Sequence, residues 1–359
     1  MPCTGSRGVV TGAWRPSEPF AYSSGPKTAR LAIVGDAWGQ QDALVGQPFQ
    51  GTAGQELSNL LSSAGIARRD CFLTNVFPLQ PMAGKIENLC GKKAEVGSDY
   101  PFHPFSQGKY ILPEYLCEVA RLHEELAVVR PNLILALGNA PAWALLGRGS
   151  ISSIRGTTTQ TEEGWKILPT FSPRHILQSW EARPILLQDL AKAKREMEFP
   201  EIRRPQRTVL VYPTLKEIEE YCLADHLILS VDIETARRQM TSIGFAATRS
   251  HAIVIPFLTD EVVPQSYWQT TAEEVQALRL VKHLLERPIP KLFQNGLYDL
   301  QYLLTLGIRP AAVAHDTMLL HHSMFPELRK GLGFLGSIYT DEGSWKLLNK
   351  KTDSTKREE

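Results

Sequence analysis

Short apolar runs alternate with helix-like segments between residues 31 and 195, and this alternation constrains the fold more than any other feature of the chain. The apolar runs, which read as buried strands, are 31–34, 71–76, 133–137 and 167–171. The helix-like segments are 52–64, 112–129, 140–146 and 183–195. Strands that alternate with helices through short links predict a parallel sheet covered by helices on both faces. We therefore expect a three-layer α/β domain with its ligand site at the carboxyl ends of the strands.

A second domain is predicted because the 359-residue chain is longer than one hydrophobic core usually serves. Charged residues and prolines at 198–207 read as a linker. Beyond it, strands are expected at 208–212, 227–232, 241–247 and 251–257, and helices at 215–223, 271–286, 297–306 and 316–324. The expected organisation is a flexible lead-in at 1–28, a first domain at 29–197 with a surface insertion at 83–110, a second domain at 208–345, and a polar tail at 346–359.

The composition limits the compartment and the partners. The formal net charge is only +1, so contact with nucleic acid must come from local patches rather than from a generally basic surface. The five cysteines are scattered without a C-x-x-C pair, which argues against a disulfide framework and for a reducing compartment. No secretory signal is visible in the first 28 residues, and the most apolar stretch, 133–147, is too short to span a bilayer. We expect a cytoplasmic protein without a membrane partner.

Side chains near the predicted strand ends suit the recognition of one nucleic-acid base. Asp36 follows Gly35 in the turn after the first strand, Phe49 lies further along the same segment, and Asn75 ends the next strand. A carboxylate, an aromatic face and an amide could stack a flipped base and read its hydrogen-bonding edge. Taken singly, these residues have plainer interpretations, as a strand-to-helix turn, a core residue and a cap. Spacing alone therefore leaves a base site as one hypothesis among these.

Six short runs, in order along the chain, make this region resemble the uracil-DNA glycosylase superfamily, and most closely its thermophile-type iron–sulfur branch. They are GDAWG at 35–39, GQPFQGTAGQ at 46–55, LTNV at 73–76, RPNLILALG at 130–138, RG at 155–156 and LPTFSP at 168–173. The resemblance implies that Asp36 handles the water nucleophile, that Phe49 stacks on uracil and that Asn75 reads the uracil edge, with Gly35 beside them. A nearby carboxylate would also stabilise the cationic sugar that forms as the glycosidic bond breaks.

Two features depart from the pattern of that family. Its last motif has a histidine before the proline, which donates to the departing uracil anion, and this chain has Ser172 there. Ser172 is therefore the second candidate catalytic residue beside Asp36, although losing one preorganised donor typically slows such a step by about a hundred- to a thousandfold. Of the four cluster cysteines, Leu79 takes the place of the third, and only Cys117 stands where a ligand would be. A cluster needs its thiolates, so no iron–sulfur cluster is expected.

A second group of acidic residues follows the linker. The apolar run 227–231 leads into Asp232 and Glu234, which the two-residue period of a strand places on one face. Asp299 lies further along, four residues after Asn295, at a strand-to-helix junction. Three carboxylates so arranged could hold Mg²⁺ or Mn²⁺ for phosphodiester hydrolysis. The plainer interpretation is a solvated strand end and an acid in the first turn of a helix.

The order D-I-E-T, N-x-x-x-D and D-T-M-L resembles the DnaQ-like 3′–5′ proofreading exonuclease of family A DNA polymerases, over about residues 206–345. The resemblance implies a mixed-sheet, ribonuclease H-like domain with Asp316 as a helix cap. It also implies a metal site with these members: Asp232, Glu234 and Asp299 as ligands and Asn295 as support. The family completes its site with Y-x-x-x-D, and no such pair follows residue 332 here.

The combination of domains leads to several hypotheses about partners and activity. A glycosylase-like domain ahead of such an exonuclease resembles the N-terminal part of a bacteriophage DNA polymerase, which implies DNA, a polymerase domain or subunit, and a bacterial host cytoplasm. The first domain is either a uracil-excising enzyme or a reader that binds without cutting. The second is either a nuclease or inert for want of its last ligand. Four basic residues, Arg155, Lys166, Arg174 and Arg183, either contact phosphates or form a solvated face.

Overall fold

The computed structural model describes residues 17–148, 150–259 and 265–342, which form two compact units. The first unit takes in the chain up to Arg203 and again from Gly333 onwards, and the second is Arg204–Leu332. The predicted polar tail at 346–359 and most of the predicted lead-in lie outside the described residues. Each unit is described by itself below.

The first unit is built on a five-stranded sheet in the order β2-β1-β5-β7-β6. Its strands are β1 (Leu31–Ala37), β2 (Cys71–Phe77), β5 (Leu133–Leu137), β6 (Thr159–Gln160) and β7 (Lys166–Thr170). The pairs of β1 with β2, β1 with β5 and β5 with β7 are parallel, and the edge strand β6 is antiparallel to β7. The strand order reverses between β1 and β5, which makes their carboxyl ends the expected crevice for a ligand in such a sheet.

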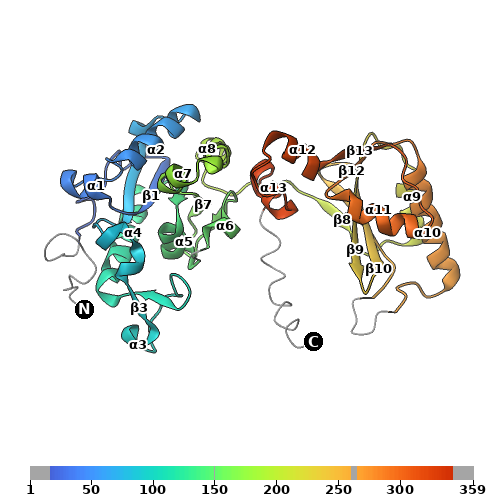
Figure 1. Ribbon diagram of the computed structural model, residues 1–359, viewed down its shortest axis with the longest axis horizontal. Helices are drawn as coiled ribbons and strands as arrows, with labels where there is room; N and C mark the ends of the chain where they lie inside the picture. Colours follow the sequence, from blue (N-terminus) through green and yellow to red (C-terminus); the bar gives the residue numbers. More distant parts are fainter. Residues whose placement is uncertain (1–16, 149, 260–264, 343–359) are drawn as a thin grey trace. The chain divides into compact units, whose positions relative to one another are not determined.

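Helices cover both faces of this sheet (Figure 1). They are α1 (Gln40–Val45), α2 (Thr52–Ser63), α4 (Leu116–Val129), α5 (Asn139–Leu146), α6 (Ile151–Ile154), α7 (Pro173–Gln178) and α8 (Arg183–Glu196). Ala32 and Val34 pack into a core with α4 and α5, whereas the alternate side chains Leu31 and Ile33 are buried on the opposite face. The predicted three-layer, parallel-sheet α/β architecture is therefore confirmed, and burial on both faces explains why these strands are continuously apolar.

Shorter elements complete the first unit. The 3-10 turns are η1 (Arg68–Asp70), η2 (Met82–Gly84), η3 (Ile86–Leu89), η4 (Pro113–Tyr115) and η5 (Trp180–Ala182). The predicted surface insertion at 83–110 contains a hairpin of β3 (Cys90–Lys92) and β4 (Lys109–Ile111), with α3 (Lys93–Val96) between them. The insertion is anchored as well as exposed, because Leu89 and Phe105 are buried and Trp143 Nε1 donates to the carbonyl of His103 at 2.8 Å.

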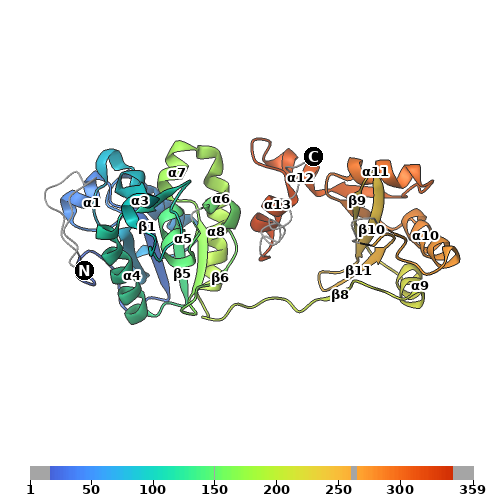
Figure 2. The same cartoon turned by 90° about the horizontal axis from the view of Figure 1, so that it is seen from below.

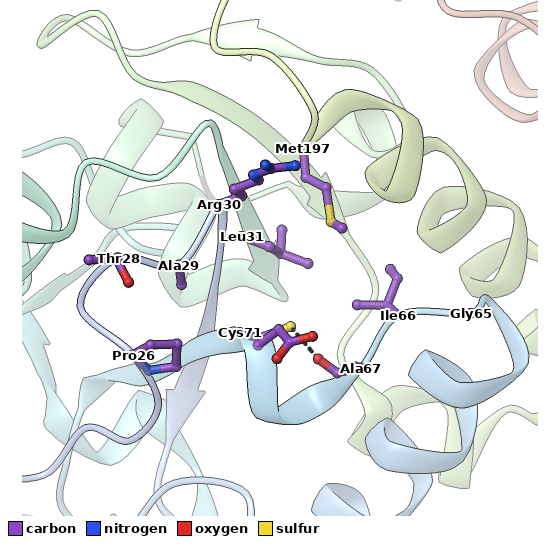
Figure 3. A pocket seen from close by; sticks show the side chains of 11 residues that line it. Pro26, Thr28, Ala29, Arg30, Leu31, Gly65, Ile66, Ala67, Cys71 and Met197 are labelled. Carbon is purple, nitrogen blue, oxygen red and sulfur yellow. Dashed lines mark hydrogen bonds between the residues drawn. The ribbon is translucent and has the colours of Figure 1, made fainter.

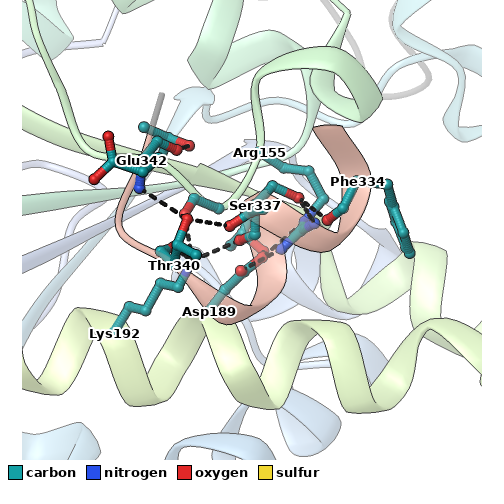
Figure 4. A network of polar contacts seen from close by, with 11 residues as sticks. Arg155, Asp189, Lys192, Phe334, Ser337, Thr340 and Glu342 are labelled. Carbon is teal, nitrogen blue, oxygen red and sulfur yellow. Dashed lines mark hydrogen bonds and ion pairs between the residues drawn. The ribbon is translucent and has the colours of Figure 1, made fainter. Parts of the chain in front are cut away.

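The described residues 333–342, which include all but the first residue of the last helix, α13 (Leu332–Tyr339), belong to the first unit, whereas the sequence predicted that residues up to 345 belong to the second domain. Figure 4 shows the buried polar network that holds this segment. Arg155 Nη1 donates to Ser337 Oγ at 2.9 Å, and Lys192 Nζ donates to the carbonyls of Ser337 at 2.5 Å and Thr340 at 2.7 Å. Asp189 accepts from Arg155 in the same network. Buried cations need acceptors, and the returning segment supplies them.

The second unit is built on a six-stranded mixed sheet in the order β13-β12-β9-β10-β11-β8. Its strands are β8 (Thr208–Leu210), β9 (Leu229–Ala236), β10 (Gln239–Ala246), β11 (His251–Pro256), β12 (Lys291–Phe293) and β13 (Val313–Asp316). The pairs of β9 with β10 and β10 with β11 are antiparallel, whereas β12 is parallel to both β9 and β13, and β8 is parallel to β11. The predicted mixed sheet is confirmed.

Four helices accompany this sheet within the described part of the second unit: α9 (Leu215–Leu223), α10 (Thr271–Glu286), α11 (Gly296–Thr305) and α12 (Thr317–Met324). Helices α9 and α10 lie side by side, as Figure 2 shows, and both begin with a capping box led by a threonine, Thr214 and Thr270. Helix α11 contacts β9, so its first turn lies close to that strand. Among the described residues, no helix is long and apolar enough to cross a membrane.

Candidate functional site

The first candidate site lies at the carboxyl ends of β1, β2 and β7, and we call its predicted members (Gly35, Asp36, Phe49, Asn75 and Ser172) the base site. Gly35 is the point where two of the others, Phe49 and Asn75, meet. A Cβ atom on Gly35 would lie 2.5 Å from Asn75 Nδ2 and 2.7 Å from Phe49 Cζ. The absence of a side chain therefore brings the amide and the aromatic ring against the same backbone position.

Phe49 is held by its backbone rather than by its ring. Its φ is +57°, which is uncommon for an aromatic residue, and its carbonyl accepts from Arg68 Nη2 at 2.9 Å. Arg68 Nη1 also donates to the carbonyl of Gly54 at 2.9 Å, which ties the start of α2 to the same point. The residue is half-buried, so part of its surface stays accessible.

Asn75 presents an unused hydrogen-bond acceptor. The residue is 3% exposed, and its Oδ1 has no hydrogen-bond partner within the part of the chain that the structure describes. Leaving a buried acceptor unpaired costs about 1–3 kcal/mol. An acceptor of this kind is expected at a site that is completed by a ligand donor.

A buried ionic network behind β2 fixes the backbone at Asn75. Arg121 Nη2 donates to the Asn75 carbonyl at 2.5 Å, and Arg121 is paired with Glu118 and Glu125, each at 2.7 Å. Glu125 Oε2 also accepts from Thr74 Oγ1 at 2.8 Å. The sequence predicted a helix at 112–129, but these residues were not identified from it. The i, i+3 and i+4 spacing of two acids around one arginine was the available signal.

Asp36 lies near the end of β1, where Gly138, directly after the neighbouring strand β5, makes room for its carboxylate. Its Oδ1 accepts from the Ala140 amide at 2.9 Å, and a Cβ on Gly138 would come within 2.5 Å of its Oδ2. Burial raises the pKa of Asp36 from 3.8 to about 6, with the Ala140 amide and the charge of Arg174 opposing that rise and Glu87 adding to it. A carboxyl group with this pKa is ionised at neutral pH and can take up a proton.

Ser172 stands at the end of β7 as the N-cap of α7, where its Oγ accepts from the His175 amide at 3.3 Å. Accepting uses one lone pair and leaves the hydroxyl hydrogen available to donate. The His175 ring is tilted against Phe171 with the ring centroids 4.7 Å apart. The structure thus gives Ser172 a clear capping role and places it two strands away from Asp36.

The described cysteines do not fit an iron–sulfur cluster. The thiols of Cys71, Cys90 and Cys117 each donate to a backbone carbonyl within their own local turn. No group of three or more His, Cys, Asp or Glu residues that could hold a metal ion is found within the described ranges. Leu79 is a buried core residue. This set of donors offers no shared thiolate site.

A cavity in the first unit lies away from the base site (Figure 3). Its lining includes Leu31 and Cys71, the first residues of β1 and β2, together with Arg30 and Met197. The cavity is therefore at the amino ends of these strands, opposite the edge that carries the predicted site residues. We assign it no role in the function of that site.

Two of the four basic residues considered as phosphate contacts are structural. Arg155 and Lys166 are 3% and 2% exposed, and Lys166 Nζ donates to the carbonyls of Phe199 and Glu201. The hypothesis that these two residues contact phosphates is therefore wrong, because their charged groups are buried and bonded to acceptors inside the first unit. Arg174 is exposed, and Arg183 is partly exposed while paired with Glu56 at 3.0 Å.

The second candidate site is the carboxylate cluster of Asp232, Glu234 and Asp299. The first two point to the exposed face of β9, and Asp299 is buried in the first turn of α11. Asp299 Oδ1 accepts from the amide of Ile233, the residue between the other two acids, at 3.0 Å. Burial raises the pKa of Asp299 to about 6 with Asp232 contributing, and burial together with Glu234 raises the pKa of Asp232. Like charge therefore couples Glu234 to Asp232 and Asp232 to Asp299.

Backbone geometry beside the carboxylate cluster depends on Asp316 and Asn295. Asp316 caps α12 by accepting from the amides of Met318 and Leu319, which confirms its expected role. Its carboxylate also accepts from the Asn295 amide at 3.1 Å. Asn295 has φ +60° and precedes α11 as its N-cap, so it sets the direction of the helix that carries Asp299.

Oxygen-only donors of this kind suit a hard divalent cation. The described residues contain no ready-made group of three acids that closes around a metal ion. Tyr298, which the sequence analysis did not single out, bonds to Thr235 Oγ1 at 2.6 Å beside the cluster.

Fold and site together define the first unit as a three-layer α/β domain with a base-sized set of polar and aromatic groups at its strand ends. The family model described as Uracil DNA glycosylase superfamily matches residues 22–197. The type-4 uracil-DNA glycosylase of Thermotoga maritima is 30% identical over 170 residues, which cover 46% of this chain and 76% of that protein. That of Archaeoglobus fulgidus is 27% identical over 177 residues, 47% of this chain and 77% of that protein. The chain belongs to the uracil DNA glycosylase superfamily.

Solved structures of exonucleases are similar to part of the chain. Escherichia coli RNase D, an exoribonuclease, shows 16% identity and a TM-score of 0.27 over 39% of this chain and 34% of its own, so the chain spans about a third of that protein. The EXD2 exonuclease domain soaked in Mg and dGMP shows 16% identity and a TM-score of 0.24 over 36% of this chain and 68% of its own. We draw no functional argument from similarities of this size.

Proposed function

We propose that the first unit recognises uracil in DNA and excises it. The observation that carries this proposal is the buried, unpartnered Oδ1 of Asn75 next to Gly35 and Phe49. Uracil has an N–H donor between two carbonyls, and this edge is complementary to an amide that offers one acceptor and one donor. The half-buried ring of Phe49 would stack on the flipped base.

The chemistry of excision is assigned to Asp36. The C1′–N1 glycosidic bond breaks and its electron pair leaves with the uracil ring, so positive charge develops on the sugar. The Asp36 carboxylate stabilises that charge and orients a water molecule, whose oxygen bonds to C1′ while its proton passes to the carboxylate. A pKa of about 6 keeps Asp36 ionised at neutral pH while leaving it basic enough to accept this proton. Ser172 is proposed as a neutral donor to the departing base.

A second candidate function for this unit is uracil reading without excision. Ser172 favours it, because the hydroxyl group already caps α7 and carries no charge to offset that of the departing base. In that case the Asn75 and Phe49 contacts would still retain a uracil-containing strand.

For the second unit, we propose a 3′–5′ exonuclease module that uses Mg²⁺ or Mn²⁺. Glu234 raises the pKa of Asp232, and Asp232 raises that of Asp299, which supports a shared cation because bound positive charge relieves like-charge repulsion. These carboxylates would hold the cations, which activate water and stabilise the charge of the phosphodiester when bound. Asn295 supports the site through its backbone position. The competing proposal is an inert module, because Y-x-x-x-D is missing after residue 332.

We further propose that the two units serve a DNA polymerase, as a domain or subunit of a bacteriophage-type replication enzyme in a bacterial host cytoplasm. The support is the sequence resemblance of the D-I-E-T and N-x-x-x-D motifs and their order after a glycosylase-type domain. Co-purification of the polymerase with this chain from infected cells would test it.

An end-labelled single strand with one internal uracil tests the main proposal. The strand is incubated with the protein in excess chelator and then heated in alkali, because chelator silences a two-metal nuclease but not a metal-free glycosylase. A break at uracil that is lost in Asp36→Asn supports excision. An intact strand that is nevertheless retained by the wild-type protein, and released by Asn75→Ala, supports the reader instead.

A further inference from the structure

The base site needs a positive charge that Ser172 cannot provide. As the glycosidic bond breaks, negative charge collects on N1 and the adjacent carbonyl of uracil. A preorganised cation or donor aimed at that charge is usually the largest single contribution to such a step. The hydroxyl of Ser172 is neutral and is engaged as a helix cap. A cation held by specific contacts at the same edge of the sheet could supply this charge.

Arg174 is fixed at the rim of the base site. It is the second residue of α7, which follows β7, and its Nη1 donates to the carbonyl of Gly84 at 2.8 Å. Gly84 ends the turn that follows β2. In the sheet, β1 and β5 lie between β2 and β7. The hydrogen bond between Arg174 and Gly84 therefore connects the segment after β7 with the segment after β2. Asp36 and Asn75 lie at the same edge of the sheet, at the carboxyl ends of β1 and β2.

The turn that receives Arg174 is shaped for a flat guanidinium group. Gly84 has φ +63°, and a Cβ there would lie 3.1 Å from Arg174 Nη2 and 3.3 Å from Nη1. A larger residue would be strained and would push the guanidinium away. Within the described part of the chain, Nε and Nη2 of Arg174 make no other hydrogen bond, and the side chain is exposed. Two donor groups thus remain for a ligand.

The charge of Arg174 reaches the reacting part of the site. It is the cation that lowers the pKa of Asp36 against the effect of burial, and it opposes the acid Glu87 on the same rim. A positive charge that acts on the Asp36 carboxylate also acts on a base held between Asp36 and Asn75.

We propose that Arg174 is a further catalytic residue of the base site, whose guanidinium group donates to the uracil anion and offsets its charge as the C1′–N1 bond breaks. This inference rests on the proposed excision and assigns to Arg174 the electrostatic role left open at Ser172. The electron pair of the broken bond goes to the uracil ring, the water oxygen bonds to C1′, and the water proton goes to Asp36.

Single-turnover excision from strands that contain uracil or 5-fluorouracil tests this role. Fluorine stabilises the ring anion, so 5-fluorouracil depends less on a cation from the protein. We expect Arg174→Gln to slow uracil excision by about thirty- to a hundredfold and 5-fluorouracil excision by only about threefold, with Arg174→Lys close to wild type. Arg69→Gln is the matched control, because Arg69 is exposed at the amino end of β2 and its side chain pairs, within the described residues, only with the neighbouring Asp70. An equal loss on both strands, or no loss, overturns the proposal.

A binding measurement gives a readout that needs no cleavage. The probes are the free bases uracil and 5-nitrouracil, whose ring is ionised at neutral pH. We expect the wild-type protein to bind the anionic base about tenfold more tightly than uracil, and Arg174→Gln to remove that preference. One outcome is that the wild-type protein shows this preference, lost in Arg174→Gln, without excising uracil. The proposal of excision is then wrong, whereas the role of Arg174 in binding the anion is supported. If Arg174→Gln retains the preference, the inference fails whatever the excision assay shows.

Discussion

At the scale of single residues, the base site depends on positions where a side chain is absent. Gly35 allows Phe49 and Asn75 to meet, and Gly138 leaves room for the Asp36 carboxylate. Glycine is required at Gly138 for a second reason, since its φ of +108° is disfavoured for other residues. The chemistry-bearing residues are therefore placed as much by these glycines as by their own contacts.

Gly35→Ala is expected to abolish uracil recognition while leaving the fold intact. The added Cβ would overlap Asn75 Nδ2 and the Phe49 ring, so one of them must move by more than a few tenths of an ångström. We expect at least about a tenfold loss of affinity for a uracil-containing strand, equivalent to about 1.4 kcal/mol. Gly39→Ala is the control in the same turn, because its Cβ would meet only Asp42 Oδ2 at an ordinary 3.5 Å. Equal affinities for the two variants, measured by fluorescence anisotropy, would contradict this account of Gly35.

Asp36→Asn is expected to abolish excision and to stabilise the first unit at neutral pH. The folded-state pKa of Asp36 is raised from 3.8 to about 6, so the charged form is disfavoured by folding. The resulting cost is absent below about pH 4 and grows as the pH rises to about 6, reaching up to about 3 kcal/mol. Asparagine avoids this cost and keeps an acceptor for the Ala140 amide.

Urea unfolding of wild type and Asp36→Asn at about pH 4 and about pH 7.5 checks this prediction. The two proteins should differ only at the higher pH. The rate of wild-type excision should fall as the pH drops below about 6, because protonated Asp36 cannot take up the water proton. A stability gain that is the same at both pH values would show that Asp36 is not the titrating group.

At the scale of elements, the strands of the first unit could be predicted well and the polar supports could not. The runs from Leu31 and Leu133 read as buried strands because both faces of a covered parallel sheet are apolar. The short strands β12 and β13 were not predicted as separate elements, because three or four residues carry too little periodicity. The Arg121 network was not predicted either, because a charged residue on an amphipathic helix usually faces solvent.

The site residues divide in the same way: residues in sequence motifs could be predicted, whereas the contacts between them could not. Asp36, Phe49 and Asn75 stand in motifs that can be read along the chain, so they could be named beforehand. Their meeting at Gly35 depends on the parallel pairing of β1 with β2, which places Gly35 opposite Asn75. The contact of Arg174 with Gly84 joins residues 90 positions apart and could not be derived from local pattern.

Removing the cation behind β2 is expected to destabilise the first unit strongly. Arg121→Ala would leave Glu118 and Glu125 buried, charged and without their arginine partner, and breaking a buried ion pair from one side typically costs about 3–5 kcal/mol. Thermal unfolding should show this loss. Arg130→Ala is the matched control at the end of the same helix, because the Arg130 side chain is exposed and, among the described residues, bonds only to the Ala127 carbonyl. A similar small effect for both variants would mean that Arg121 contributes little to the fold.

At the scale of the whole molecule, the two proposed kinds of chemistry belong to two different compact units. Excision by the base site needs a carboxylate and water but no metal, whereas the carboxylate cluster needs a divalent cation. The two activities should therefore separate both by variant and by chelator. Asp36→Asn should remove breaks at uracil and leave metal-dependent trimming of the 3′ end, and Asp232→Ala should do the reverse.

One labelled strand with a single uracil can report both activities. With Mg²⁺, the wild-type protein should give a ladder from the 3′ end together with the uracil break that appears after alkali. With excess chelator, only the uracil break should remain. A ladder that persists in Asp232→Ala would show that the carboxylate cluster does not catalyse the trimming reaction. A uracil break without any ladder in the wild type would instead favour an inert second unit, as expected if the missing Y-x-x-x-D pair is required.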